Sequence, residues 1–86
     1  MPCVSEFYGV AIYMYYNDHA PPHFHAEYGG DEAQIAIDTL EVLQGKLKRR
    51  SLAMVLKWSA MHRQELGENW DRAREGLPLN QIEPLD

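Results

Sequence analysis

The first part of the chain is built of short runs in which apolar residues alternate with other residues, a pattern typical of β-strands. The run 6–16 is rich in aromatic and β-branched residues, and we expect it to form one long strand. Side chains alternate across a strand, so Tyr13 and Tyr15 share one face of it. The opposite face is aliphatic and is the expected core face; it carries Val10, Ile12 and Met14.

Turn residues divide the next segment into three further strands. Asn17 and Asp18 end the first strand, and Pro21-Pro22 then makes a rigid, extended connection. Gly29-Gly30-Asp31 predicts a hairpin turn, because glycine supplies the positive φ of a tight reversal. The three strands are expected at 23–28, 32–38 and 42–45. Within residues 6–45 the sequence therefore predicts a four-stranded antiparallel meander.

After Lys48 the apolar residues recur at spacings of three and four, which indicates a helix. Gly76 followed by Pro78 marks its end, so we expect one long helix at about 50–75 and an extended or frayed tail at 77–86. Gly67 is the expected place for a kink. The predicted fold is α+β, with a four-stranded antiparallel meander sheet packed on one long C-terminal α-helix.

Length and charge limit the possible functions. A chain of 86 residues has enough apolar material for one core, so residues 1–86 are expected to form a single domain. The net charge of −5 argues against a large duplex-DNA footprint. The single Cys3 forms no internal disulfide, and no apolar run has the length of a signal or membrane segment, so we expect a cytoplasmic protein without membrane contact.

The strongest chemical signal is the concentration of three histidines in residues 19–25, beside two prolines. His23, His25 and Glu27 are spaced to project from one face of a strand, which makes them candidate ligands for Zn or another divalent transition metal. His19 could reach the same place from the rigid loop. A metal held by three protein ligands, with one coordination position open, is typical of catalytic sites.

A second hypothesis is metal-free RNA cleavage. Two of His19, His23 and His25 would act as general base and general acid on the 2′-hydroxyl and the leaving oxygen. A local group of basic residues is available to contact a phosphate and consists of Lys46, Lys48 and Arg49. RNA is therefore a possible partner, although such basic groups often serve only to solvate a helix end.

A third hypothesis is purely structural. His23 and His25 would then be half-exposed strand residues, bonded to Asp18, Glu27 or the backbone. His62 lies at the edge of the helical apolar stripe. If Phe24 faces the helix, His23 and His25 face away from it, and His62 cannot join them within one subunit.

Surplus apolar and aromatic surface predicts a protein partner. The helix carries a second apolar stripe of Met54, Trp58 and Met61, which one sheet cannot cover together with the first. A row of exposed tyrosines resembles a protein interface, so Tyr13 and Tyr15 are candidate interface residues. We expect a homodimer, a small cognate partner protein, or both. A non-enzymatic interaction module is thus the alternative to a catalytic site.

The same residues carry a family resemblance. Asn17-Asp18-His19, Pro21-Pro22-His23-Phe24-His25 and the later Trp58, His62, Asn69 and Trp70 resemble the bacterial family called domain of unknown function 4160. The resemblance covers almost the whole chain. It implies a small cytosolic protein of a kind often encoded beside a second small protein in an arrangement like that of toxin-antitoxin pairs. The toxin-antitoxin-like role is what the resemblance suggests, and the histidine motif is the expected working site.

Overall fold

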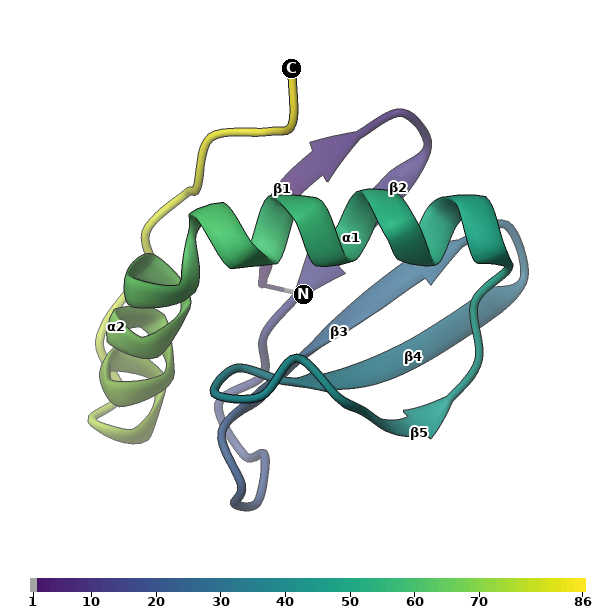
Figure 1. Cartoon of the computed structure of the whole chain (residues 1–86). Coiled ribbons are helices and arrows are strands. Elements are labelled where there is room, and N and C mark those ends of the chain that lie inside the picture. Colours follow the sequence, from purple (N-terminus) through teal and green to yellow (C-terminus); the bar gives the residue numbers. More distant parts are fainter. Residues whose placement is uncertain (1) are drawn as a thin grey trace.

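Five antiparallel strands form one sheet in chain order (Figure 1). The structure is a computed structural model and describes residues 2–86. The strands are β1 (Cys3–Phe7), β2 (Val10–Tyr13), β3 (His23–Tyr28), β4 (Asp31–Ala36) and β5 (Val42–Gly45). The α+β class and the antiparallel meander are confirmed. The number of strands is not, because the sheet has five strands where four were expected.

The additional strand comes from a reversal at Tyr8-Gly9. Phe7 pairs with Val10 across a two-residue loop in which both residues have positive φ, 48° at Tyr8 and 84° at Gly9. Such loops match the twist of the strands they join. The run 6–16 therefore contains the end of β1, the turn and β2 instead of a single long strand, and its regular part ends at Tyr13.

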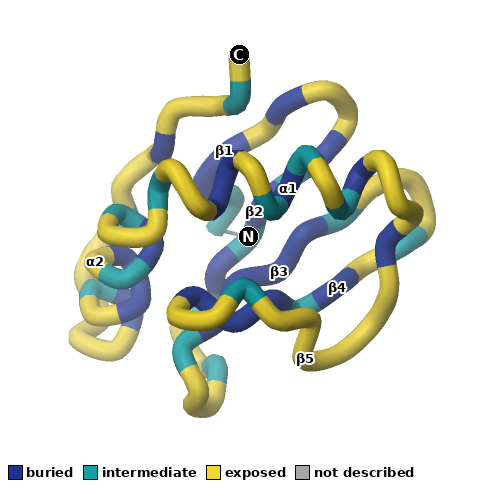
Figure 2. The backbone as a smooth tube through the Cα atoms, in the orientation of Figure 1, coloured by how far each residue is buried: buried dark blue, intermediate teal, exposed yellow. Residues whose placement is uncertain are grey.

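The core lies between one face of the sheet and the helix α1 (Arg49–Met61), which crosses that face in Figure 1. Trp58 is fully buried there, with its ring 6.0 Å from Phe24 and 5.4 Å from Phe7. The tube in Figure 2 is coloured as buried along most of β3. Val10, Ile12 and Met14 are buried as predicted. Trp58 belongs to this core and not to a second, uncovered stripe.

A second helix, α2 (Arg63–Arg74), follows α1, so the single helix expected at 50–75 is wrong. The break lies at His62, whose φ of −124° is not helical, and Gly67 stays inside α2. The His62 carbonyl accepts the first bond of α2, from the Leu66 N–H at 2.9 Å. Figure 1 shows α2 turning away at the end of the sheet, where Trp70 can pack. In the described residues neither helix is long and apolar enough to cross a membrane.

The tail that follows α2 is extended, as expected, but it is not frayed. The Trp58 indole N–H donates to the Glu83 carbonyl at 2.8 Å, and the Ile82 N–H donates to the Val4 carbonyl at 2.8 Å. Asn69 exchanges two hydrogen bonds with the main chain of Asn80. These bonds hold the tail beside β1, so β5 is the outer strand that lacks such a cover in the described part of the chain.

The close approach of β5 to β4 depends on Gly45. Its φ is +81°, and a Cβ there would lie 2.2 Å from the Glu32 carbonyl oxygen. We predict that Gly45→Ala lowers the free energy of unfolding by at least about 2 kcal/mol, measured by urea denaturation. Gly67→Ala is the matched control: its Cβ would meet nothing within 4 Å in α2, so it should raise stability by about 0.5–1 kcal/mol. Equal effects of the two variants would contradict this account.

Candidate metal centre

His23 and His25 lie on the sheet face that is turned away from α1. The strand alternates, so that Phe24 and Ala26 are in the core while the two histidines project to the other side. Both histidines are nevertheless only 6% exposed. The predicted alternation is confirmed, but the expectation of half-exposed imidazoles is wrong. Burying two polar rings is costly unless their nitrogens find partners.

The two imidazoles converge on one carboxylate oxygen. Oδ2 of Asp18 lies 3.0 Å from Nε2 of His25 and 3.4 Å from Nε2 of His23. Three ligand atoms, one from each side chain, all lie within 4.8 Å of one another. Asp18 belongs to the loop between β2 and β3, so the loop and the strand meet at this point.

The outer ring nitrogens are bonded to acceptors. Nδ1 of His23 donates to the Pro21 carbonyl at 2.8 Å, and Nδ1 of His25 is hydrogen-bonded to Oε2 of Glu32 at 3.1 Å. Nε2 of His25 is also hydrogen-bonded to Oδ2 of Asp18 at 3.0 Å. A neutral imidazole with its only N–H on Nδ1 presents a lone pair at Nε2, so this contact needs a shared proton or a cation. An ionised carboxylate is also an acceptor only. The meeting point of the three side chains is therefore electron-rich and is suited to a proton or a cation.

Aromatic rings enclose the two histidines. The Tyr15 ring stands edge-on to His25 with centroids 4.6 Å apart, and the Trp70 ring of α2 lies 5.4 Å from His23. Partial burial raises the pKa of the Tyr15 phenol, and nearby carboxylates, first that of Glu32, raise it further. Tyr15 thus contributes an uncharged wall to an acidic site.

A surface hollow of about 360 Å³ opens beside the cluster. Two of the three converging side chains, Asp18 and His23, form part of its wall, so the cluster is accessible from one side. The rest of the wall comes from the loop before β3 and from β4 and β5, namely His19, Ala20, Pro21, Gln34, Leu43 and Gln44. A ligand in this hollow would lie next to the imidazoles.

The structure brings together only part of the predicted site. His23 and His25 meet, but the carboxylate that joins them is Asp18 and not Glu27. Glu27 lies farther along β3, half-buried and paired with Ala11 and Glu32. His19 is exposed at the wall of the hollow and does not belong to the converging group.

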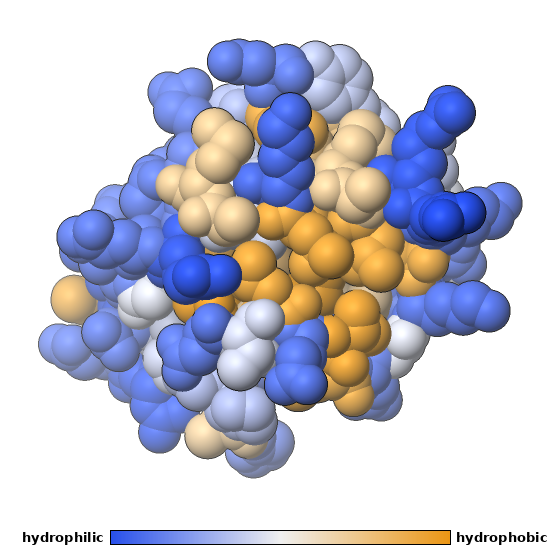
Figure 3. All heavy atoms as spheres, viewed as in Figure 1, coloured by the Kyte–Doolittle hydropathy of each residue, from blue (hydrophilic) through white to orange (hydrophobic). Residues whose placement is uncertain are grey.

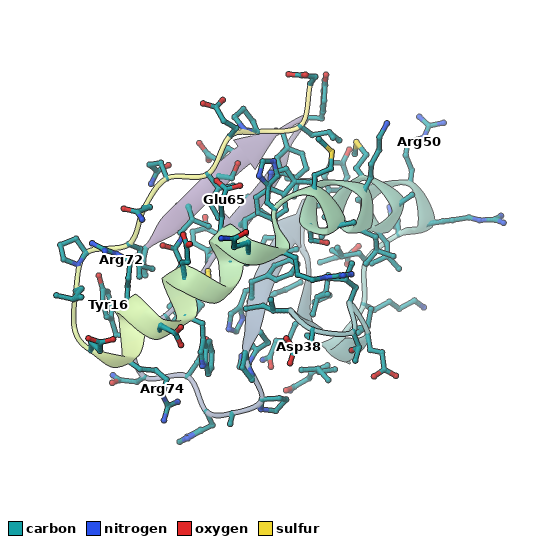
Figure 4. The ribbon with its side chains drawn as sticks, turned by 60° about the vertical axis from the view of Figure 1, so that its left-hand side comes forward. Tyr16, Asp38, Arg50, Glu65, Arg72 and Arg74 are labelled. Atoms are coloured by element: carbon teal, nitrogen blue, oxygen red, sulfur yellow. The ribbon has the colours of Figure 1, made fainter. Side chains whose placement is uncertain are left out.

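His62 lies apart from the motif, a question that the sequence had left open. Its Nδ1 is hydrogen-bonded to Oε1 of Glu65, and its ring lies 5.4 Å from Trp58 on the α1 side of the sheet. Figure 4 shows Glu65 near the junction of the two helices. His62 therefore lies at the break between α1 and α2 and is not part of the histidine cluster.

The basic residues Lys46, Lys48 and Arg49 lie around the start of α1. Lys48 lines a separate hollow with Tyr28, at the opposite end of β3 from His23. Figure 4 shows Arg50 at the end of α1 that is remote from α2. None of the three candidate anion contacts lines the hollow beside the histidine cluster.

Sequence analysis missed Glu32 and treated Asp18 only as a hydrogen-bond partner. A signal for Glu32 was present, because the loop between β3 and β4 is the two residues Gly29-Gly30. That loop length places Glu27 opposite Glu32 and His25 opposite Gln34. Pairing the two strands across a two-residue turn puts the Glu32 side chain on the histidine face, diagonally opposite His25.

Comparison with known proteins identifies the family. Residues 9–71 match the family model described as Domain of unknown function (DUF4160), and the chain belongs to this family. The matched region contains the whole histidine cluster and most of the sheet. No curated protein and no solved structure matches the chain.

The contact between Tyr15 and His25 yields a stability prediction. Tyr15→Ala removes the ring that covers the imidazole, and we expect it to lower the free energy of unfolding by about 1–2 kcal/mol in urea denaturation. Tyr15→Phe keeps the ring and should stay within about 0.5 kcal/mol of the wild type. A Tyr15→Ala variant as stable as the wild type would show that the ring does not support the site.

Proposed function

We propose that this protein binds a divalent transition metal in a mononuclear centre whose ligands are Asp18, His23 and His25. The observation that carries the proposal is the convergence of one carboxylate oxygen and two Nε2 atoms while both outer nitrogens are hydrogen-bonded to acceptor groups. Histidine ligands of metals characteristically donate their other N–H to a carboxylate or a backbone carbonyl. His25 has the first kind of partner and His23 has the second.

The spacing of the ligand atoms supports the proposal. Bonds of about 2.0–2.1 Å at tetrahedral angles put neighbouring ligand atoms roughly 3.3 Å apart. The distances from Asp18 Oδ2 to His25 Nε2 and His23 Nε2, 3.0 and 3.4 Å, lie on either side of this value. Two imidazoles and one carboxylate suit Zn²⁺ and also Fe²⁺, Mn²⁺, Co²⁺ or Ni²⁺.

We further propose that the centre is hydrolytic. A metal with three protein ligands keeps a position for water or substrate and acts as a Lewis acid. The hollow of about 360 Å³ reaches Asp18 and His23 and so offers space for a substrate. His19, exposed in its wall, is our candidate for proton transfer to or from that substrate.

The contacts of the imidazoles favour this hypothesis over metal-free RNA cleavage. In a two-histidine mechanism one ring nitrogen must face the attacking hydroxyl and another the leaving oxygen. Here Nε2 of His23 and of His25 both face Asp18. The carboxylate would also repel a phosphate that approached without a cation. RNA cleavage by His19, His23 and His25 stays a prediction with less support.

The partner predictions rest on the surface. Figure 3 shows apolar side chains gathered on the face that carries α1, and Val42 of β5 is 41% exposed. This surface is what supports a homodimer or a small partner protein, including a partner of toxin-antitoxin type. In the alternative function, an interaction module that uses Tyr13 and Tyr15, both residues are half-exposed, although the Tyr15 ring also packs on His25.

A pair of acidic variants tests the ligand set. Asp18→Asn removes the shared anionic ligand, and we expect it to weaken Zn²⁺ or Co²⁺ binding more than about 100-fold in calorimetric titration. Glu27→Gln is the matched control and should keep wild-type affinity and a stoichiometry of one. If Glu27→Gln loses metal binding and Asp18→Asn keeps it, the carboxylate ligand is Glu27 and not Asp18. If the wild type binds no metal, the proposed centre is refuted.

Glu32 should act as a positioning residue. Glu32→Gln leaves the ligands in place but removes the charge that supports the N–H of His25, so we expect metal affinity to fall by about 10- to 100-fold. The imidazole signals of the variant, followed by NMR during titration with Zn²⁺, should still report binding through Nε2. Unchanged affinity would show that the Glu32 contact has no role in the centre.

A further inference from the structure

We propose that the hollow beside the metal centre recognises uncharged substrates that carry an amide group. The proposal rests on the proposed function and names the substrate class of that same site. Its basis is the chemistry of the wall: two carboxamides, one imidazole and one leucine lie around the metal ligands, with no Lys or Arg among the described lining residues.

Gln34 and Gln44 are the recognition groups. They are directly paired across β4 and β5, so their side chains leave the sheet on the same side. That side is the histidine face, because Gln34 also pairs with His25. Each carboxamide offers two donor hydrogens and an acceptor oxygen, the same groups that an amide ligand needs for pairing.

A bulge in β5 brings Leu43 into the same wall. Gln34 pairs with Gln44 and the next residue, Ile35, pairs with Val42, so Leu43 is the extra residue on β5. In a regular strand Leu43 and Gln44 would point to opposite faces, whereas here both line the hollow. Bulges occur beside active sites because they redirect a side chain in this way. The hollow therefore has an apolar side next to its two carboxamides.

The charges around the hollow disfavour polyanions. Asp18 lies in its wall, and Glu32 is hydrogen-bonded to His25 just behind it. The cationic side chains of Lys48 and Arg50 line the other hollow, with Tyr28, beyond the far end of β3. An RNA phosphate chain in the hollow would thus meet the Asp18 carboxylate and no Lys or Arg of the wall. Arg74, stacked on the Trp70 ring that packs on His23, does not line the hollow.

The corresponding reaction is amide hydrolysis. The oxygen of water bonds to the carbonyl carbon, the C–N bond breaks, one proton of the water passes to the leaving nitrogen, and the resulting acid releases another. His19 is placed to carry the proton to the nitrogen. The metal supplies the Lewis acid for this step. No oxidant or other co-reactant is needed.

Two hydroxamates of equal chain length test the inference on the Co²⁺-loaded protein. N-acetylglycine hydroxamate and pentanohydroxamate chelate the metal through the same atoms, but only the first carries an additional amide. Binding is measured from the visible absorption bands of cobalt. We expect the amide-bearing compound to bind about three- to tenfold more tightly, as one or two hydrogen bonds provide.

Variants assign that preference to residues. Gln34→Leu and Gln44→Leu should each reduce the preference to less than twofold while cobalt affinity stays at the wild-type value. Gln64→Leu, exposed on α2, is the matched control and should keep the full preference. An equal affinity of the wild type for the two hydroxamates overturns the inference, as does a preference that survives both variants.

The outcomes separate this inference from the metal centre itself. If the chain binds no cobalt, the centre and the substrate class fall together. If cobalt binds and the hydroxamates are not distinguished, only the substrate class is refuted. A diribonucleoside monophosphate that displaces N-acetylglycine hydroxamate and binds more tightly than it does would overturn the inference in favour of a nucleic-acid substrate.

Discussion

The need to pair every ring nitrogen of two buried histidines governs the structure around β3. A strand that buries Phe24 and Ala26 against a helix sends His23 and His25 to the opposite face, where little else covers them. The loop from Asp18 to Pro22 closes over the rings, and β4 supplies Glu32 from the other side. Loop, strand and hairpin register are thus constrained by the same four nitrogen atoms, since unpaired buried polar groups are costly.

The break at His62 lets the two helices pack against different parts of the sheet. α1 carries Val55 and Trp58, which complete the core on one face of the sheet. α2 changes direction and brings Trp70 against His23 at the end of the sheet. A continuous helix would have projected past the sheet and left the imidazole without this ring. The helix break therefore connects the core to the histidine cluster, and Glu65 stabilises the break through its hydrogen bond with His62.

Much of this architecture could be predicted from the sequence. Strand alternation correctly assigned Phe24 to the core and the two histidines to the other face, because a period of two is a local property. The reversal at Tyr8-Gly9 was missed since a tyrosine with positive φ is rare. The break at His62 was placed at Gly67, because propensity identifies glycine as the weak point whereas tertiary contacts of Leu66 and Trp70 decide the direction of α2.

The candidate site was predicted in its residue types and only partly in its members. His23 and His25 follow from spacing alone, but the choice of Asp18 over Glu27 depends on how the proline loop folds back, which alternation does not describe. Glu32 and the pairing of Gln34 with Gln44 depend on exact strand register and on a bulge at Leu43. A shift of one residue reverses the face of a side chain, so small errors in turn length hide such contacts.

The groups that form the cluster all lie between positions 18 and 32, in one loop and one hairpin. Bringing them together closes only short loops, and the entropy lost in closing a loop grows with its length. The side chains of the cluster can therefore approach one another even in a chain whose helices have not yet docked on the sheet. A metal ion bound at that stage would hold β3 and β4 in alignment. Because the ion would then also bind the unfolded chain, it would stabilise the folded state less than an ion that binds the folded state alone.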